Sequence, residues 1–479
     1  MTEIFDILDP IFHPRSVAFV GITISDPSHW TRTFWEAFRK FKFNGPLYPV
    51  NPRGGELDGH KVYLSLDDIP DNVDYAIGTV AARIAPEIVR QCARKGIKAI
   101  HFCTAGFAET GEKEVAGLQD ELTRLARETG VRVIGPNCMG IYCPESKMSF
   151  DSSFPLEAGP VSVISQSGGN TEFLIMEAGW RGVRFNKVVS FGNACDLNEC
   201  DFLEYFIQDP TTRVIALYLE GVRDGGRFFD LIKKASAEKT VVLIKGGFGE
   251  AGARATATHT ASLAGNHLIW EALCRQFNLI RPRNMEEMVD VLVTLTFMPD
   301  PGGRNVILIG PGGGASVLLT DEFERRGFRL PPLPQSIRNK LVSFTRLAGN
   351  MLGNPIDYSQ SMMESDNLLR AVEILTDWDE VDFCMGFLRP SQLSIEAFAA
   401  MFSESLSQAY SKSHKPVGYI CEDARLPERN NAIFQLIQKI VATKMPLYYT
   451  FPAAAEALKM VIEYNECRLS REAAAAARQ

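Results

Sequence analysis

The sequence predicts an α/β protein made of three consecutive doubly wound domains. Short, continuous apolar runs such as 16–20 and 306–309 are typical of buried parallel strands. Segments with helical periodicity separate these runs, and glycines often stand where the runs end. This pattern favours strands and helices that alternate in parallel sheets. The chain has 479 residues, enough for about three domains of ordinary size.

The first block runs from about residue 11 to residue 144. Its predicted strands are 16–20, 46–50, 73–80, 97–103 and 131–134. Its predicted helices are 34–41, 84–95 and 113–129, and the last two end at Gly96 and Gly130. Residues 51–55 read Asn-Pro-Arg-Gly-Gly, which predicts a turn.

The second block runs from about residue 159 to residue 298 and has predicted strands at 161–164, 188–191, 214–219 and 241–244. Residues 299–303 are typical of a linker, and the third block extends from the strand at 306–309 to about Tyr464. We therefore predict domains at 1–147, 148–298 and 303–465, followed by a tail at 466–479. The Ala-rich end, 471–479, either extends a last helix or frays.

The totals exclude several classes of protein. The net charge of −8 argues against sequence-independent binding of nucleic acid. No apolar run approaches the length of a membrane span, and the acidic start of the chain is unlike a signal peptide. The ten cysteines form no C-x-x-C pair, and the seven histidines form no cluster with ligand spacing. We therefore expect reduced thiols, a cytoplasmic location and no metal site.

A strand, a glycine-rich loop and a helix follow one another in matched form in the second and third blocks. The first of these cradles is 165–170, with Ser165, Ser167, Gly168 and Gly169. The second is 310–316, with Gly313 and Gly314. Glycine lets backbone approach a ligand closely, and the first turn of a helix offers unpaired N–H groups and a positive dipole end. A single loop of this kind is often only a tight turn, but two of them indicate phosphate binding.

His259 lies in the stretch Thr-His-Thr-Ala-Ser-Leu-Ala-Gly, 258–265, whose small side chains leave room for a bulky anion beside the imidazole ring. An imidazole nitrogen is a good phosphoryl acceptor near neutral pH and needs no metal. For a lone histidine, a hydrogen-bonded core position would be the better interpretation. Together with two phosphate cradles, the pattern favours a histidine that carries a phosphoryl group.

With these motifs, the chain resembles the α subunit of the NDP-forming acyl-CoA synthetases, in the succinyl-CoA synthetase superfamily. The resemblance covers about residues 10–465. It rests on the His259 stretch, the two cradles, the run 218–221 that contains Glu220, and the run 134–138 together with Gly140. It implies that His259 becomes phosphorylated and that helix N-termini at the cradles stabilise the phosphohistidine. It also implies that Glu220 hydrogen-bonds the imidazole, which would fix its tautomer. Without the resemblance, Glu220 would be interpreted as a solvated glutamate at a strand end.

The first block resembles the family's Rossmann-like CoA-binding domain, and the second and third resemble its flavodoxin-like ligase domains. The resemblance implies that CoA is bound by Gly21, Asn51, Pro52, Arg53, Val80, Ala105, Gly106, Asn137 and Cys138. The loop 22–30 departs from the family pattern because it lacks the usual second glycine, so the approach to the pyrophosphate is expected to differ. Ala261 replaces a usual glycine after His259. Cys138 and Cys195 are expected to be buried thiols rather than nucleophiles.

No segment of the chain corresponds to the ATP-grasp domain that a full synthetase of this type needs. The resemblance therefore implies a separate ATP-grasp β subunit in an α2β2 assembly, with ATP or GTP and Mg²⁺ on that partner. The implied reaction forms acyl-CoA from a small carboxylic acid, CoA and the nucleotide through phosphohistidine and acyl phosphate intermediates. The acid is not identifiable, although 192–193, Cys195 and 354–357 are candidate pocket edges.

Two other functions stay open at this point. One is a non-catalytic CoA-binding or regulatory subunit, which would bind CoA but never become phosphorylated. The other is a nicotinamide-dependent oxidoreductase, suggested by the first block alone. No Gly-x-Gly-x-x-Gly pattern follows Gly21, which counts against the oxidoreductase.

Overall fold

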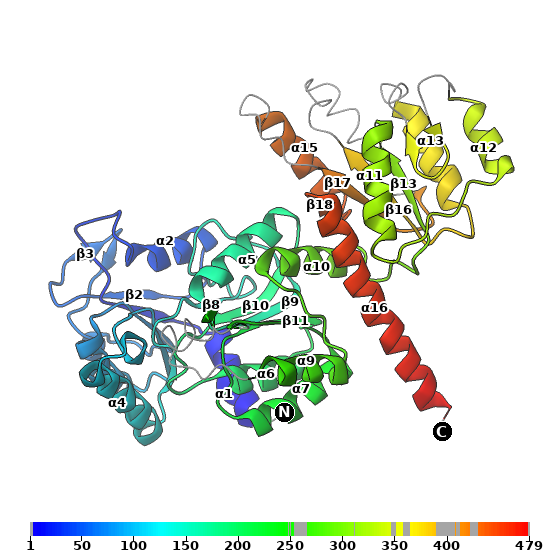
Figure 1. Ribbon diagram of the computed structural model, residues 1–479. Helices are drawn as coiled ribbons and strands as arrows, with labels where there is room; N and C mark the ends of the chain where they lie inside the picture. Colours follow the sequence, from blue (N-terminus) through cyan, green and yellow to red (C-terminus); the bar gives the residue numbers. More distant parts are fainter. Residues whose placement is uncertain are drawn as a thin grey trace. The chain divides into compact units, whose positions relative to one another are not determined.

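The computed structural model in Figure 1 describes residues 3–247, 249, 251–252, 266–310, 312–345, 351–357, 365–388, 408, 412–421 and 430–477. The chain divides into two compact units. Unit 1 consists of Met1–Met176 and Arg184–Arg281, and unit 2 consists of Glu177–Val183 and Pro282–Gln479. Unit 1 contains two large sheets and unit 2 contains a third, so the predicted α/β fold class is confirmed.

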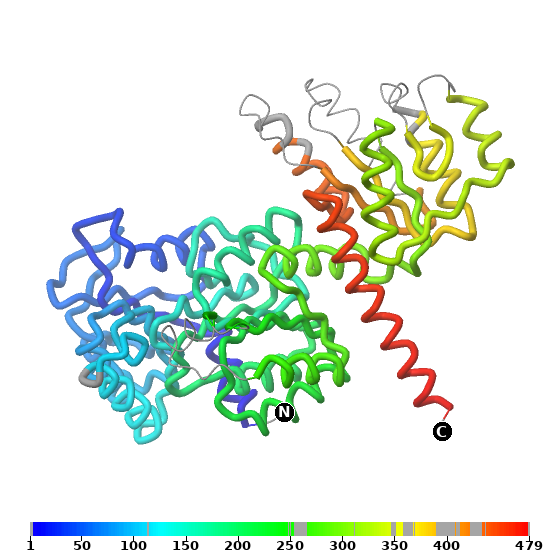
Figure 2. Tube along the Cα trace, in the orientation of Figure 1, coloured from blue at the N-terminus to red at the C-terminus, as the bar shows by residue number. Residues whose placement is uncertain are grey.

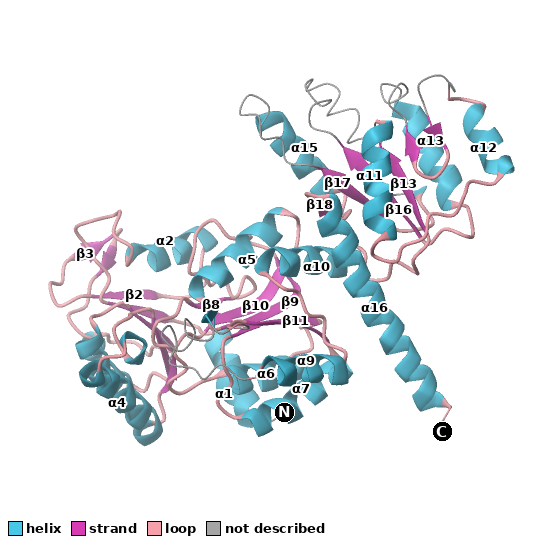
Figure 3. Cartoon of the chain, in the orientation of Figure 1, coloured by secondary structure: helices cyan, strands magenta, loops and turns pink. Residues whose placement is uncertain are grey.

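The first sheet is entirely parallel and has the order β2-β1-β5-β6-β7. Its strands are β1 (Val17–Val20), β2 (Leu47–Val50), β5 (Tyr75–Gly78), β6 (Ala99–Phe102) and β7 (Arg132–Ile134). Helices α2 (Arg32–Phe41), α3 (Ala85–Lys95) and α4 (Lys113–Thr129) connect them. Figure 3 shows α2 and α4 on opposite faces of the sheet. The chain crosses from β2 past β1 to β5, so the topological switch point lies between β1 and β5.

The first block also contains several short elements. A hairpin of β3 (Glu56–Leu57) and β4 (His60–Lys61) follows the predicted turn. Single turns of 3₁₀ helix lie at η1 (Leu66–Asp68), η2 (Ala82–Ile84) and η3 (Ala108–Thr110). The core is continuous from β1 to β7 and includes the fully buried side chains of Ile100, Phe102 and Val133.

The second sheet has the order β12-β11-β9-β10-β8, and all of its strands are parallel except β8 at one edge. The strands are β8 (Gly140–Tyr142), β9 (Ala158–Ser165), β10 (Phe185–Ser190), β11 (Val214–Leu219) and β12 (Thr240–Lys245). Helices α6 (Glu199–Gln208), α7 (Gly225–Glu238) and α9 (His267–Phe277) lie on one face, and α5 (Gly168–Trp180) begins on the other (Figure 3). The switch point is between β9 and β11, because β10 pairs with the opposite side of β9.

Helix α1 (Glu3–Phe12) is an element that the sequence pattern did not predict, because the helix is short and contains Pro10. It packs against α6 of the second sheet, which places the start of the chain beside a segment 200 residues away (Figure 2). The ring of Phe12 stacks on Tyr205 with centroids 5.1 Å apart, and the Tyr205 hydroxyl donates to Asp9 at 2.8 Å.

The third sheet has the order β14-β15-β13-β16-β17-β18, with β14 antiparallel at the edge. Its strands are β13 (Val306–Gly310), β14 (Met351–Leu352), β15 (Ile356–Asp357), β16 (Phe383–Leu388), β17 (Val417–Cys421) and β18 (Leu447–Tyr448). The helices of unit 2 are α10 (Met285–Phe297), α11 (Gly313–Glu324), α12 (Gln335–Val342), α13 (Ser365–Thr376), α15 (Asn430–Ala442) and α16 (Phe451–Ala476). Helix α16 continues through the Ala-rich end of the chain to Ala476. Its buried residues lie between Ala454 and Ile462, well before that end.

Within the residues that the structure describes, no helix is long and apolar enough to cross a membrane. Over the same residues, no group of three or more His, Cys, Asp or Glu side chains is arranged to hold a metal ion.

Candidate active site

The first cradle joins the end of β9 to the start of α5. The Ser165 hydroxyl donates to the carbonyl of Ser167 at 3.0 Å and accepts from the Ser167 amide at 3.2 Å, so it braces the loop itself. The Ser167 hydroxyl accepts from the amide of Asn170 at 3.3 Å in the first turn of α5. A Cβ added at Gly169 would meet no atom of the described residues within 4 Å, so no described side chain covers this part of the cradle. The first amides of α5 lie at the positive end of that helix, where an anion is favoured.

Glu220 follows β11 directly and lies at the carboxyl edge of the sheet beside this cradle, because β9 and β11 are neighbours. Its side chain is buried. The backbone amides of Glu220 and Gly221 both donate to the side-chain oxygen of Gln166, the latter at 3.0 Å. Gln166 thus ties the Glu220 segment to the first cradle across the switch point. The sequence motif included Gln166, but only the strand order reveals this role.

Two further groups surround the Glu220 carboxylate. The Tyr218 hydroxyl donates to it at 3.3 Å, and burial together with this carboxylate raises the pKa of Tyr218 to about 12. Burial lowers the pKa of the Lys245 ammonium, and the Glu220 charge opposes that shift. A Cβ on Gly246 would lie 3.3 Å from the Glu220 Cγ, so the segment that leads toward His259 starts in contact with Glu220. Sequence reasoning did not assign Tyr218 or Lys245 a role, although both stand at strand ends.

His259 itself lies outside the described residues, as do its neighbours from 253 to 265. The described chain resumes at Asn266, whose side chain accepts from the amide of Leu268 and caps α9.

The second cradle lies in unit 2, between β13 and α11, and differs in charge from the first. The Gly312 amide donates to the Asp357 carboxylate at 2.9 Å, and Asp357 ends the neighbouring strand β15. Asp357 is buried, and its other oxygen would lie 3.7 Å from a Cβ on Gly313. The positive end of α11 therefore already faces a carboxylate of the same chain, whereas the hydrogen bonds described for the loop of the first cradle are made by hydroxyl groups and by Gln166.

The residues predicted to bind CoA gather at the carboxyl edge of the first sheet. Gly21, Asn51, Val80, Gly106 and Asn137 follow β1, β2, β5, β6 and β7 respectively, with Pro52, Arg53, Ala105 and Cys138 adjacent to them. Gly21 has a φ of +91°, and a Cβ there would approach the Val80 Cγ1 to 2.8 Å. Only glycine fits this position at the switch point between β1 and β5.

Three of these residues also have structural partners. The Asn51 amide group donates to the carbonyl of Ile22 at 2.8 Å and its oxygen accepts from the Arg53 amide at 2.9 Å, so Asn51 fixes the atypical loop after Gly21. Arg53 is exposed. Cys138 is buried, its thiol donates to the carbonyl of Phe102 at 3.5 Å, and burial raises its pKa.

A cavity of about 520 Å³ lies at the opposite, amino end of β2, with Lys42, Phe43, Leu47 and Tyr63 among its walls. None of the residues predicted to bind CoA lines it. Since ligands of doubly wound sheets bind at the carboxyl ends of the strands, this cavity is separate from the candidate site.

Comparison with known proteins follows the same division of the chain. Residues 15–144 match the CoA binding domain family, and residues 158–295 match the succinyl-CoA ligase like flavodoxin domain. The α subunit of ADP-forming acetate–CoA ligase I from Pyrococcus furiosus is 36% identical over 331 residues, covering 67% of this chain and 71% of the relative. The α subunit of ligase II from that organism is 34% identical over 438 residues, covering 88% and 93%.

A solved structure agrees over almost the whole chain. It is that of the dinucleotide forming acetyl-coenzyme A synthetase 1 of Ca. Korarchaeum cryptofilum, in complex with phosphate and ADP. It superposes with a TM-score of 0.79 at 30% identity, covering 96% of this chain and 97% of that one. The chain belongs to the NDP-forming acyl-CoA synthetases. It is an α-subunit type of acid–thiol ligase, which uses CoA and a nucleotide.

Membership of the NDP-forming acyl-CoA synthetases decides between the functions left open by the sequence. A nicotinamide-dependent oxidoreductase is excluded by the ligase family, and the comparisons give no support to a non-catalytic subunit. These two relatives are themselves named as α subunits of their ligases.

Proposed function

We propose that this chain and an ATP-grasp β subunit join a carboxylic acid to CoA through a phosphohistidine at His259 and an acyl phosphate. The observation that carries the proposal is the position of Glu220. Its buried carboxylate lies at the switch point of the second sheet, beside the first cradle and in contact with the segment that leads to His259. Ligands of doubly wound sheets bind at this kind of position.

Glu220 orients the nucleophile. Its carboxylate accepts the N–H of one imidazole nitrogen, which leaves the lone pair of the other nitrogen free to attack. Gln166 holds the Glu220 backbone, and Tyr218 holds the carboxylate from one side. These contacts keep the acceptor in place.

The first cradle stabilises the phosphoryl group. Gly168 and Gly169 present backbone amides at the start of α5, and a phosphoryl dianion is stabilised there by hydrogen bonds and by the helix dipole. At the second cradle, with Gly313 and Gly314, the Asp357 carboxylate already accepts from the adjacent Gly312 amide, and its negative charge would weaken the binding of a phosphoryl dianion there.

The reaction has three balanced steps. The His259 nitrogen attacks the γ-phosphorus of the nucleoside triphosphate, and the diphosphate leaves. An oxygen of the substrate carboxylate then attacks the phosphohistidine, which forms the acyl phosphate and restores the imidazole. The CoA thiolate attacks the acyl carbon, and inorganic phosphate leaves with the electron pair of the broken C–O bond. Each covalent intermediate divides one difficult displacement into easier ones.

CoA and the nucleotide are bound by different parts of the enzyme. CoA is bound at the carboxyl edge of the first sheet by the glycine loops after β1 and β6, and a Cβ on Gly106 would meet only Ala82, at 3.7 Å. Nucleotide and Mg²⁺ are bound by the β subunit in an α2β2 assembly. ATP and acetate are the first substrates to test, since the related chains are named ADP-forming acetate–CoA ligases.

The decisive experiment measures transfer of labelled phosphate from ATP to this chain, co-expressed with its ATP-grasp partner. We expect one label per chain that is lost in acid, stable in base and absent from His259→Asn. Addition of acetate and CoA should discharge the label and release inorganic phosphate.

His267→Asn is the matched control, because His267 is a described histidine at the start of α9, outside the candidate site. It should be labelled like the natural chain. If a partner shown to bind ATP leaves the natural chain unlabelled, the phosphohistidine mechanism is wrong.

A further inference from the structure

Residues 192–197, here called the strap, join the second sheet of unit 1 to the first. The strap follows β10 and runs beside the end of β7. The amides of Asn193, Cys195 and Leu197 donate to the carbonyls of Pro136, Gly135 and Val133 at 3.0, 2.9 and 3.2 Å. Alternate amides of the strap thus pair with the segment that carries Asn137, one of the residues predicted to bind CoA.

Gly192 fixes the start of the strap. Its φ is +52°, and a Cβ there would lie 2.2 Å from the carbonyl oxygen of Asn137 and 2.4 Å from that of Pro136. No side chain fits between these two backbone oxygens, so Asn193 is delivered to one defined place.

Asn193 is buried, and both its side-chain nitrogen and its backbone carbonyl are hydrogen-bonded. It is only 4% exposed. Its side-chain nitrogen donates to the Glu109 carboxylate at 2.6 Å and to the Gln119 carbonyl oxygen at 2.9 Å. The second oxygen of Glu109 accepts from the amides of Gly106 and Phe107 at 2.6 and 3.1 Å. Through Glu109, the strap therefore holds the glycine loop after β6.

The opposite side of Asn193 reaches the Glu220 segment. Its backbone carbonyl accepts from the Arg223 guanidinium at 2.8 Å. The Arg223 amide in turn donates to the buried Glu199 carboxylate at 3.0 Å, at the start of α6. Arg223 stands three residues after Glu220, so one residue links the loop of the first sheet with the strand end that carries Glu220.

We propose that Asn193 is a positioning residue that couples CoA binding at the Gly106 loop to phosphoryl transfer at the Glu220 segment. The proposal rests on the function proposed above, which places CoA at the first sheet and His259 beside Glu220. A ligand that orders the Gly106 loop pulls on Glu109 and thereby on the strap. The Asn193 carbonyl then shifts or steadies Arg223 and the backbone that bears Glu220. Coupling of this kind acts in both directions, so a change at either end alters the behaviour of the other.

A merely structural Asn193 would stabilise unit 1 without linking the two sites. The two possibilities differ in whether a substitution on one side changes the behaviour of the site on the other side. Arg223→Ala breaks the contact on the Glu220 side, and coupling predicts weaker CoA binding although Arg223 is outside the CoA-binding set. Asn193→Ala breaks the contact on the CoA side, and coupling predicts slower labelling of His259 by ATP, even before CoA is added.

The experiment uses the full chain for CoA titration by calorimetry and the chain with its β subunit for the rate of phosphate incorporation. Arg223→Ala removes one of the hydrogen bonds described above and Asn193→Ala removes two, and the loss of one such bond corresponds to an effect of roughly three- to tenfold. We expect Arg223→Ala to raise the Kd for CoA and Asn193→Ala to slow labelling, each within that range. CoA should also change the labelling rate of the natural chain by a factor that falls toward one in Asn193→Ala.

Thr123→Val is the matched control. The Thr123 hydroxyl donates to the strap at the Cys195 carbonyl at 2.9 Å but contacts neither Glu109 nor Arg223 in the described hydrogen bonds. Valine preserves the shape, and both readouts should stay within about twofold of the natural chain. If its melting temperature shows that Asn193→Ala is poorly folded, Gln119→Ala is used in its place. That variant removes one of the two acceptors of the Asn193 side-chain nitrogen.

The outcomes separate the two proposals. If the natural chain binds CoA and is labelled, but Arg223→Ala binds CoA normally and Asn193→Ala is labelled normally, the coupling is wrong and the mechanism stands. The coupling is equally wrong if Thr123→Val reproduces both effects. If the natural chain is never labelled, the proposed function fails first and removes the basis of the coupling.

Discussion

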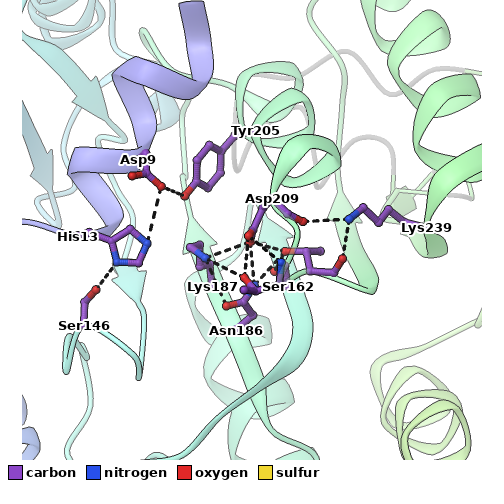
Figure 4. A network of polar contacts seen from close by, with 11 residues as sticks. Asp9, His13, Ser146, Ser162, Asn186, Lys187, Tyr205, Asp209 and Lys239 are labelled. Carbon is purple, nitrogen blue, oxygen red and sulfur yellow. Dashed lines mark hydrogen bonds and ion pairs between the residues drawn. The ribbon is translucent and has the colours of Figure 1, made fainter. Parts of the chain in front are cut away.

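Each end of the second sheet contains a buried carboxylate, but the two carboxylates have different surroundings. At the amino end, Lys187 and Asp209 form an ion pair 3.0 Å long with side chains 3% and 5% exposed (Figure 4). Asn186, Thr211 and Thr212 also donate to the Asp209 carboxylate, at 2.6 to 2.8 Å. At the carboxyl end, the Glu220 carboxylate borders Tyr218, Gly246 and the first cradle.

The comparison separates groups that stabilise the fold from groups available for chemistry. At the amino end, the two opposite charges neutralise each other and the neighbouring amide and hydroxyls saturate the carboxylate, so nothing faces a ligand. At the carboxyl end, backbone contacts fix the position of Glu220 while its side chain borders Gly246 at the end of β12. Substitutions at the two ends should therefore have opposite effects on stability and activity.

The largest effect is expected for Asp209→Asn. The change leaves the Lys187 ammonium buried without its counter-charge, which typically costs about 3–5 kcal/mol in the free energy of unfolding. Native-state hydrogen exchange at the amides of β10 measures this loss within unit 1 without assuming that the whole chain unfolds in one step. At temperatures where the variant stays folded, its phosphate incorporation should match that of the natural chain.

Glu128→Gln serves as the comparison for that variant. Glu128 pairs with Arg124 one helical turn away in α4, and both side chains are more than half exposed. An exposed pair of this kind is worth about 0.3–0.5 kcal/mol. A loss below about 1 kcal/mol for Asp209→Asn would mean that the amino-end network does not stabilise the sheet.

Glu220→Gln should show the opposite pattern. Glutamine keeps the shape but removes the negative charge that holds the imidazole tautomer and stabilises the imidazolium, so the labelling rate should fall about 100-fold. The free energy of unfolding should change by less than about 1 kcal/mol, because the backbone contacts to Gln166 remain. Rapid-quench labelling with excess ATP measures the rate. A normal rate in this variant would remove Glu220 from the mechanism.

The sequence predicted the fold where local pattern determines it. Strands such as β1 and β5 are buried on both faces, so each is a continuous apolar run that is visible without any partner. The order of strands in a sheet depends on which side each crossover helix packs, and no single run contains that information. The antiparallel edge strand β8 and the packing of α1 against α6 were missed for the same reason.

In the candidate site, the sequence predicted the residues at strand ends but not the contacts that depend on strand order. Glu220 and the cradle glycines follow strands directly, so the carboxyl-edge rule places them correctly along the sheet. The role of Gln166 depends on β9 and β11 being neighbours, and that of Asn193 on two sheets packing together. Lys187 and Asp209 are 22 residues apart, and neither stands out from its strand or turn in the sequence.

The smallest expected effect is the pH dependence of the amino-end network. Burial alone would raise the pKa of Asp209, but the hydroxyls of Thr211 and Thr212 and the Lys187 charge together lower it to about 2. The carboxyl is therefore more acidic in the folded chain than its ordinary value of 3.8 in the unfolded chain. Its contribution is complete above about pH 4 and is lost as the pH falls toward 2, because protons then bind the unfolded chain first.

That shift corresponds to roughly 2 kcal/mol. The difference in free energy of unfolding between the natural chain and Asp209→Asn should be constant from pH 5 to 7 and shrink by that amount between about pH 4 and 2. Hydrogen exchange at β10 amides, corrected for the intrinsic rate at each pH, measures the difference. A difference that stays constant down to pH 2 would show that the buried pair is not held together by the Asp209 charge.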